Sequence, residues 1–288
     1  VISVRHRETR ARERPDQHTP RRTMRHDPDD LPALTKAGYM ATNAMARACI
    51  GTALALPYRW RVPFMGWIMG RLIGPAAGFL RRAEAHVALI FPHLPHAEHR
   101  RIAKASLNNA GRTLIENYST HEAARAAVVA RGFAVGGLYR EMKNPYFNAH
   151  YVRTMQAFGG PVFAQGRKGT AGFVRHLKAG GQLVLLFDQH VQRAPILDFL
   201  GHPARTAVSA AELALRYNAL LIPFYGIRRA DGLGFDCVME APIPASDPET
   251  MTQAMNDSIG ARIRANPEQW LWVARRWRTD EPYPEDFT

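Results

Sequence analysis

The second half of the chain alternates short apolar runs with amphipathic stretches, and this alternation constrains the fold more than any other feature. The apolar runs predict strands, and the stretches between them have the period of helices. This alternation is typical of an α/β fold with a mostly parallel central sheet covered by helices. The predicted strands are 133–139, 182–188, 220–226 and 234–240, and the predicted helices are 97–115, 122–131, 145–158, 169–179, 206–217 and 249–265.

The first half of the chain has a different character. Residues 1–30 are polar and lack periodicity, which predicts a disordered basic tail. We expect residues 31–96 to form a helical membrane-anchoring region and 97–288 to form the α/β domain. Within the helical region, 39–58 and 62–80 approach bilayer-spanning length and carry one arginine each. We read them as a membrane-embedded or interfacial helical hairpin. A single span and buried core helices of a soluble domain remain open alternatives.

The charge balance indicates an anionic partner. The net charge is +13, and residues 59–104 carry eight Lys and Arg against Glu84 and Glu98. Basic residues beside apolar segments are typical of proteins bound to an anionic membrane surface, although an ordinary solvated basic face would look similar. The chain has no recognised nucleic-acid motif, so we expect no nucleic acid partner. Its two cysteines have no metal-ligand spacing, so we expect no metal site.

Several short motifs occur in a fixed order along the chain. They are 81–84 (RRAE), 91–92 (FP), 111–116 (GRTLIE), 139–146 (YREMKNPY), 166–169 (GRKG), 185–189 (LLFDQ), 199–201 (FLG), 267–272 (PEQWLW) and 275–277 (RRW). This ordered set resembles the lauroyl/myristoyl (late) acyltransferases of lipid A biosynthesis, within the lysophospholipid acyltransferase family. The resemblance covers roughly residues 37–278 and implies a glycerolipid acyltransferase-like fold.

The resemblance also implies a reaction. A fatty acyl chain would move from acyl carrier protein, or from CoA, to a hydroxyl of a phosphorylated lipid A-type glycolipid. The acyl thioester is a co-substrate, and no cofactor is expected. The implied location is the cytoplasmic face of the bacterial inner membrane. The family's central device is a His followed, after four residues, by Asp or Glu. The His takes the proton of the attacking hydroxyl, and the carboxylate orients the imidazole.

This chain lacks the His of that device. Glu122 matches the family's acid, but Asn117 stands five positions earlier, and a neutral amide cannot accept the proton. The segment that carries the His in the family, including a central strand, is missing. We therefore predict a sheet that is one strand short. His121 is adjacent to Glu122 and points elsewhere on a helix. His93 and Glu98 form a literal match that we interpret as accidental, because short patterns often match by chance and His93 lies in a linker.

Other candidate site residues follow the predicted strands. Arg140 could bind a phosphate or the developing oxyanion, or form a structural ion pair. Lys143 and Asn144 precede a helix, where Asn144 could bind substrate or act only as an N-cap.

Two further pairs complete the predicted site. Arg167 and Lys168 lie at another helix start and could receive a phosphate or remain solvated. Asp188 and Gln189 end a strand, where α/β sheets place ligands. We predict an acyltransferase whose activity is doubtful without the His. The alternative is an inactive relative that binds acidic lipid or acyl carrier protein.

Overall fold

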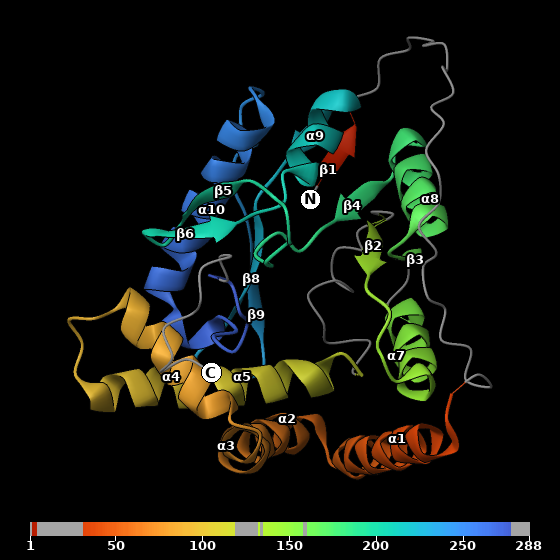
Figure 1. Cartoon of the computed structure of the whole chain (residues 1–288), viewed down its shortest axis with the longest axis vertical. Helices are drawn as coiled ribbons and strands as arrows, with labels where there is room; N and C mark the ends of the chain where they lie inside the picture. The colour runs from red at the N-terminus through yellow and green to blue at the C-terminus, as the bar shows by residue number, and fades with distance from the viewer. Residues whose placement is uncertain (1, 5–30, 119–131, 133–134, 158–159, 278–288) are drawn as a thin grey trace.

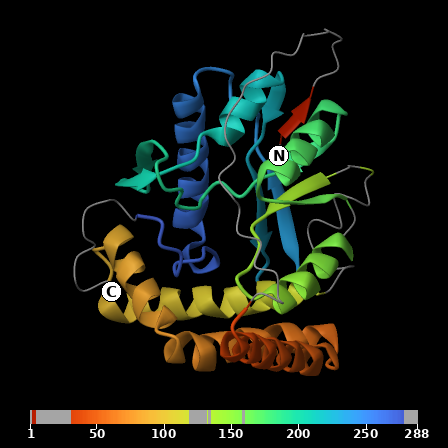
Figure 2. The ribbon, with the colours of Figure 1, turned by 45° about the vertical axis from the view of Figure 1, so that its right-hand side comes forward.

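The computed structural model describes residues 2–4, 31–118, 132, 135–157 and 160–277 (Figure 1). A helical layer comes first in the chain. It contains α1 (Ala33–Leu54), α2 (Tyr58–Ile68), the π-helix η2 (Met69–Ile73), α3 (Gly74–Ala76), α4 (Phe79–Ile90) and α5 (His96–Glu116). Helices α1 to α3 line one edge of the molecule, and α5 lies between them and the strands (Figures 1 and 2). None of the helices among the described residues is both long enough and apolar enough to cross a bilayer.

The largest sheet has the strand order β3-β2-β4-β1-β7. Its strands are β1 (Ile2–Val4), β2 (Val135–Tyr139), β3 (Val162–Ala164), β4 (Gln182–Val184) and β7 (Ala219–Leu221). β2 runs parallel to β3 and to β4, and Gly136 is paired with Leu183. β1 runs antiparallel to both β4 and β7. The expected mixture of helices and parallel strands is thus present, but the parallel part consists of three neighbouring strands.

Two hairpins and four helices complete the described α/β part. The hairpins pair β5 (Ile196–Phe199) with β6 (His202–Arg205) and β8 (Phe224–Arg228) with β9 (Phe235–Met239). The helices are α7 (Pro145–Ala157), α8 (Arg167–Lys178), α9 (Ser209–Arg216) and α10 (Pro248–Ala265), followed by the 3₁₀ turn η3 (Pro267–Gln269). Figure 1 shows α7 and α8 on the opposite side of the strands from α10.

Residues 2–4 form β1, because the edges of β4 and β7 offer them backbone partners on both sides. The rest of the predicted tail, 5–30, lies outside the described residues, so the tail stays a prediction. Two predicted strands need correction. The strand predicted at 182–188 ends at Val184. The strand predicted at 220–226 is divided into β7 and β8 around Pro223, whose nitrogen cannot donate to a ladder.

The prediction of a missing strand falls largely on residues that are not described. The predicted helix at 122–131 and the connection at 119–121 lie outside the described residues. Within the described part, β1 occupies the position between β4 and β7. A strand from the beginning of the chain, antiparallel to its neighbours, therefore fills that place in the sheet.

A tryptophan cluster joins the helical layer to the α/β part. Trp270, Trp272 and Trp277 pack against Phe199 and the apolar side chains of α4 and α5 in one continuous core. Trp272 is fully buried, and its carbonyl oxygen is 2.6 Å from Nδ1 of buried His86 on α4. The core therefore continues across residue 96, where the sequence predicted the beginning of the α/β domain.

Helix α5 packs closely against α2 and η2 because glycines face the contact. A Cβ on Gly66 would lie 2.7 Å from Oδ1 of Asn108, and a Cβ on Gly111 would collide with the carbonyl oxygen of Met65. Since backbone atoms cannot move aside as a flexible side chain can, Gly111 is the tighter of the two positions.

We expect Gly111→Ala to lower the free energy of unfolding by about 1–3 kcal/mol, because the added methyl group forces α2 and α5 apart. Gly51 in α1 is the matched control, since a Cβ there meets nothing within 4 Å. Gly51→Ala should be neutral or should stabilise by up to about 1 kcal/mol through helix propensity. Urea denaturation of both variants measures the difference, and equal values would contradict the close contact.

Candidate functional site

An apolar cavity lies between the segment that follows β4, the strand β8 and helix α10. Its volume is about 450 Å³, within the range of about 300–1,000 Å³ that is typical of ligand sites. Its walls are formed mainly by Leu185, Phe187, Ile222, Tyr225, Met255, Ile259, Ile263 and Trp270. Asp188, Arg262, Asn266 and Gln269 contribute the polar positions. We call it the apolar cavity.

Asp188 lies at this cavity and is held in place. Nε1 of Trp270 donates a hydrogen bond of 2.9 Å to Oδ2 of Asp188. The indole is itself fixed in the tryptophan cluster, so the carboxylate is oriented by a rigid donor. Gln189 follows at an exposed position. Asp188 therefore lines a cavity, and its role in substrate binding stays a prediction.

Buried Arg276 interacts electrostatically with Asp188. Its side chain is inaccessible to solvent and donates to the carbonyl oxygen of Arg205 and to Oγ1 of Thr206. Burial lowers the pKa of Arg276 to about 10, and the negative charge of Asp188 opposes that change. Arg276 was named from the sequence only as part of the motif at 275–277. Its burial beside Asp188 depends on the tertiary fold.

The parallel strands bring several predicted residues to one edge of the sheet. Arg140 follows β2 directly, and its Nε donates to Oε1 of Gln165, which follows β3. Arg167 and Lys168 then begin α8 and are exposed. Asp188 follows the run that begins with β4. Because the carboxyl ends of parallel strands meet at one edge, these side chains share the same end of the sheet.

Asn144 has a structural role. Its Oδ1 accepts hydrogen bonds from the backbone nitrogens of Tyr146 and Phe147, so it caps the start of α7. Its Nδ2 donates to the carbonyl oxygen of Tyr39 and to Oγ1 of Thr42, which ties α7 to α1. These bonds favour the N-cap interpretation over substrate binding. Lys143 precedes it at an exposed position.

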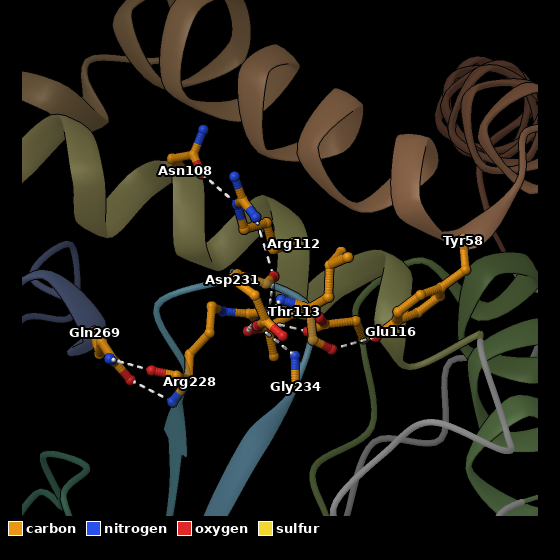
Figure 3. Close-up of polar contacts among 11 residues, drawn as sticks. Tyr58, Asn108, Arg112, Thr113, Glu116, Arg228, Asp231, Gly234 and Gln269 are labelled. Carbon is orange, nitrogen blue, oxygen red and sulfur yellow. Dashed lines mark hydrogen bonds and ion pairs between the residues drawn. The ribbon is translucent and has the colours of Figure 1, made fainter.

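The end of α5 is fixed by a buried ion pair. Glu116 accepts two hydrogen bonds from Arg228 on β8, of 2.5 Å at Oε1 and 2.7 Å at Oε2 (Figure 3). The exposed fractions of the two side chains are only 5% and 6%. Nη2 of Arg228 also donates to Thr113, and Gln269 bonds both the nitrogen and the oxygen of the Arg228 backbone. Sequence reasoning missed this pair, although Glu116 belongs to a quoted motif.

Asn117, at the position expected for the base, comes directly after Glu116 and is the C-cap of α5. Glu122 and His121 lie outside the described residues, so their geometry stays a prediction. Glu98 accepts two hydrogen bonds from Nε of Arg101, and exposed His93 packs on Phe91. This arrangement supports the interpretation of His93 and Glu98 as an accidental match. No group of side chains suited to a metal ion occurs in the described part of the chain.

Comparison with known sequences identifies the class of protein. The chain matches the family described as bacterial lipid A biosynthesis acyltransferase over residues 118–279, which is more than half of its 288 residues. The chain therefore belongs to the bacterial lipid A biosynthesis acyltransferase family.

Individual relatives agree with this family. The chain is 26% identical over 152 residues to a lipid A biosynthesis acyltransferase of Haemophilus influenzae, covering 52% of this chain and 48% of the relative. It is 29% identical over 150 residues to the lipid A biosynthesis lauroyltransferase of Escherichia coli, covering 50% and 48%. A phosphatidylinositol mannoside acyltransferase of Mycobacterium tuberculosis is 31% identical over 97 residues, covering 33% and 31%. The matches thus span about half or less of each relative's length.

We expect Glu116→Gln to lower the free energy of unfolding by about 3–5 kcal/mol, because Arg228 would remain buried without its counter-charge. Asp236→Asn is the matched control. Asp236 pairs with Arg229 at the surface, where the two side chains are 60% and 57% exposed, and such pairs contribute at most about 1 kcal/mol. Urea denaturation of the two variants should therefore give clearly different losses, and similar small losses would contradict the buried pair.

Proposed function

We propose that this chain transfers a fatty acyl chain from an acyl thioester to a hydroxyl of a phosphorylated, lipid A-type glycolipid. The apolar cavity beside Asp188 carries the proposal, together with membership of the family. Acyl carrier protein is the proposed donor, with CoA as the other thioester. The proposed place of action is the cytoplasmic face of the bacterial inner membrane, where an anionic surface would attract the basic helical layer.

The apolar cavity suits the acyl chain. Aliphatic and aromatic side chains form most of its wall, so an extended hydrocarbon would replace water there without losing hydrogen bonds. We propose that the thioester end of the acyl chain lies beside the polar residues of the cavity. Tyr225 and Arg262 are already engaged, since the Tyr225 hydroxyl contacts Ser258 and Arg262 pairs with Glu240. Asp188 is thus the acidic group proposed to face the reacting end.

The basic residues at the sheet edge suit the acceptor. Arg140, Arg167 and Lys168 gather beside Gln165 at the carboxyl ends of β2 and β3. An exposed guanidinium can bind a phosphate with two parallel hydrogen bonds, and the N-terminus of α8 adds a positive dipole. We propose that these residues orient the phosphorylated glycolipid, and that Arg140 also stabilises the oxyanion of the tetrahedral intermediate.

The missing base determines the expected rate. Glu122 matches the acid of the family's pair, but Asn117 cannot take the proton of the acceptor hydroxyl. Binding and electrostatic stabilisation would remain, whereas general-base catalysis would be lost. A second candidate function follows from Asn117 at the position of the base. The chain would then be an inactive relative that retains binding of acidic lipid or of acyl carrier protein.

Turnover distinguishes the two candidates. With lauroyl–acyl carrier protein and a phosphorylated glycolipid acceptor, we expect a rate about 10²–10⁴-fold below that of the E. coli lauroyltransferase, which is the usual loss when a general base is absent. Glu122→Ala should abolish what remains. A rate equal to that of the E. coli lauroyltransferase would contradict the prediction that this chain lacks the catalytic base. If the chain is completely inactive, and inserting the His-bearing segment of the E. coli enzyme restores turnover, the second candidate function, an inactive relative, is favoured.

Filling the apolar cavity tests acyl binding without requiring turnover. Ile259 lines the cavity, so Ile259→Trp should weaken binding of a fluorescent twelve-carbon fatty acid at least about tenfold by occupying its space. Ile196 on β5 is 52% exposed and does not line the cavity, which makes Ile196→Trp the matched control. Equal affinities of the two variants would place the acyl chain elsewhere.

A further inference from the structure

A second cavity is lined by Arg228, the basic member of the buried ion pair. It lies between η2, the middle of α5 and the turn that joins β8 to β9, and its volume is about 560 Å³. Five basic residues line it: Arg71, Lys104, Arg112, Arg228 and Arg229. Gln269 lines both cavities. We call this second space the basic cavity.

The positive charge of the basic cavity is only partly neutralised. Arg228 is paired with Glu116, and Arg229 with Asp236. Two carboxylates also line the cavity, and both are engaged. Glu268 binds Arg101, and Asp231 accepts hydrogen bonds from the backbone N–H groups of Leu233 and Gly234 and keeps its negative charge. Within the described residues, no carboxylate forms an ion pair with the remaining three cations, Arg71, Lys104 and Arg112.

The surroundings of Arg112 contain more positive charge than negative charge. Its Nε donates to Oδ1 of Asn108 and its Nη1 to the carbonyl oxygen of Gly232, so the guanidinium is fixed at the cavity wall (Figure 3). Burial and the neighbouring charge of Arg228 lower the pKa of Arg112, and Glu116 offsets this only partly. An anion entering the cavity would therefore meet a preoriented donor whose charge is not yet compensated.

The rim of the basic cavity is apolar. Trp67 lines the cavity and is 48% exposed. Leu72 and Ile73 follow Arg71 in η2 and are 52% and 41% exposed. Trp60 lies two helical turns before Trp67 on the same face of α2 and is also exposed. Exposed tryptophans and aliphatic side chains beside cations are typical of surfaces that lie at the boundary of a bilayer.

We propose that the basic cavity binds the phosphate of an anionic phospholipid head group while Trp67 and its apolar neighbours contact the acyl chains. Arg71 and Lys104 reach the phosphate from the two helices, and Arg112 supplies a fixed fork of donors. A phosphomonoester suits the three cations best, because it carries nearly two negative charges and three acceptor oxygens. The proposal deepens the membrane association proposed above and does not depend on acyl transfer.

Vesicle binding tests the assignment. The full chain is floated with phosphatidylcholine vesicles that contain either phosphatidic acid, a phosphomonoester, or phosphatidylglycerol, a phosphodiester, adjusted to the same zeta potential. We expect a preference of about fivefold or more for phosphatidic acid. Arg71→Gln with Lys104→Gln should abolish this preference. The control, Arg81→Gln with Arg175→Gln, removes the same charge from exposed positions outside the cavity and should retain it.

Several outcomes would overturn the proposal. Absence of any preference in the wild-type chain, or a preference that survives in the first double variant, would reduce the cavity to a diffuse basic surface. A rise in melting temperature with millimolar inorganic phosphate, lost in the same variant but without any vesicle preference, would assign the site to free phosphate. Arg71 and Lys104 are exposed, so circular dichroism should show an unchanged fold. None of these measurements requires turnover.

Discussion

The ion pair between Glu116 and Arg228 connects the two halves of the molecule. It joins the last residue of α5 to β8 across 112 positions of sequence, and its Arg228 lines the basic cavity. Burying two charges has a high desolvation cost, so the pair must be matched by good geometry and additional hydrogen bonds. Thr113 and Gln269 supply these bonds. The contact therefore holds β8, which contributes to the lining of both cavities, against the end of α5.

The two cavities differ in the chemistry of their walls. The apolar cavity offers space for a hydrocarbon chain, and the basic cavity offers charge for a phosphate. Gln269 forms part of both walls. For a protein of this family, such a division would let one lipid be held at the surface while another presents its acyl chain. The proposed acyl transfer and the proposed phosphate site can therefore fail independently.

Sequence patterns predicted long elements well and short ones poorly. Helix α10 was predicted at 249–265 and observed at Pro248–Ala265, because Asp247 caps it and its apolar period is regular. β4 ended at Val184, four residues earlier than predicted. An apolar run such as 185–187 has the composition of a strand. It forms one only where the edge of a neighbouring strand provides backbone hydrogen bonds, and the tertiary fold decides which strands are neighbours. The split at Pro223 had a signal in the sequence that was overlooked.

The sequence by itself determined the family, the absence of His at the position of Asn117, and the set of residues that follow parallel strands. These features depend on local motifs and their order. Only the tertiary structure decided that Asn144 is a cap, that Glu116 pairs with Arg228, and that the N-terminal strand β1 lies between β4 and β7. Each of these joins segments distant in sequence or selects one of several possible partners. The physical reason is that water satisfies each polar group in the unfolded chain. Its partner within the protein is selected only when folding removes that water.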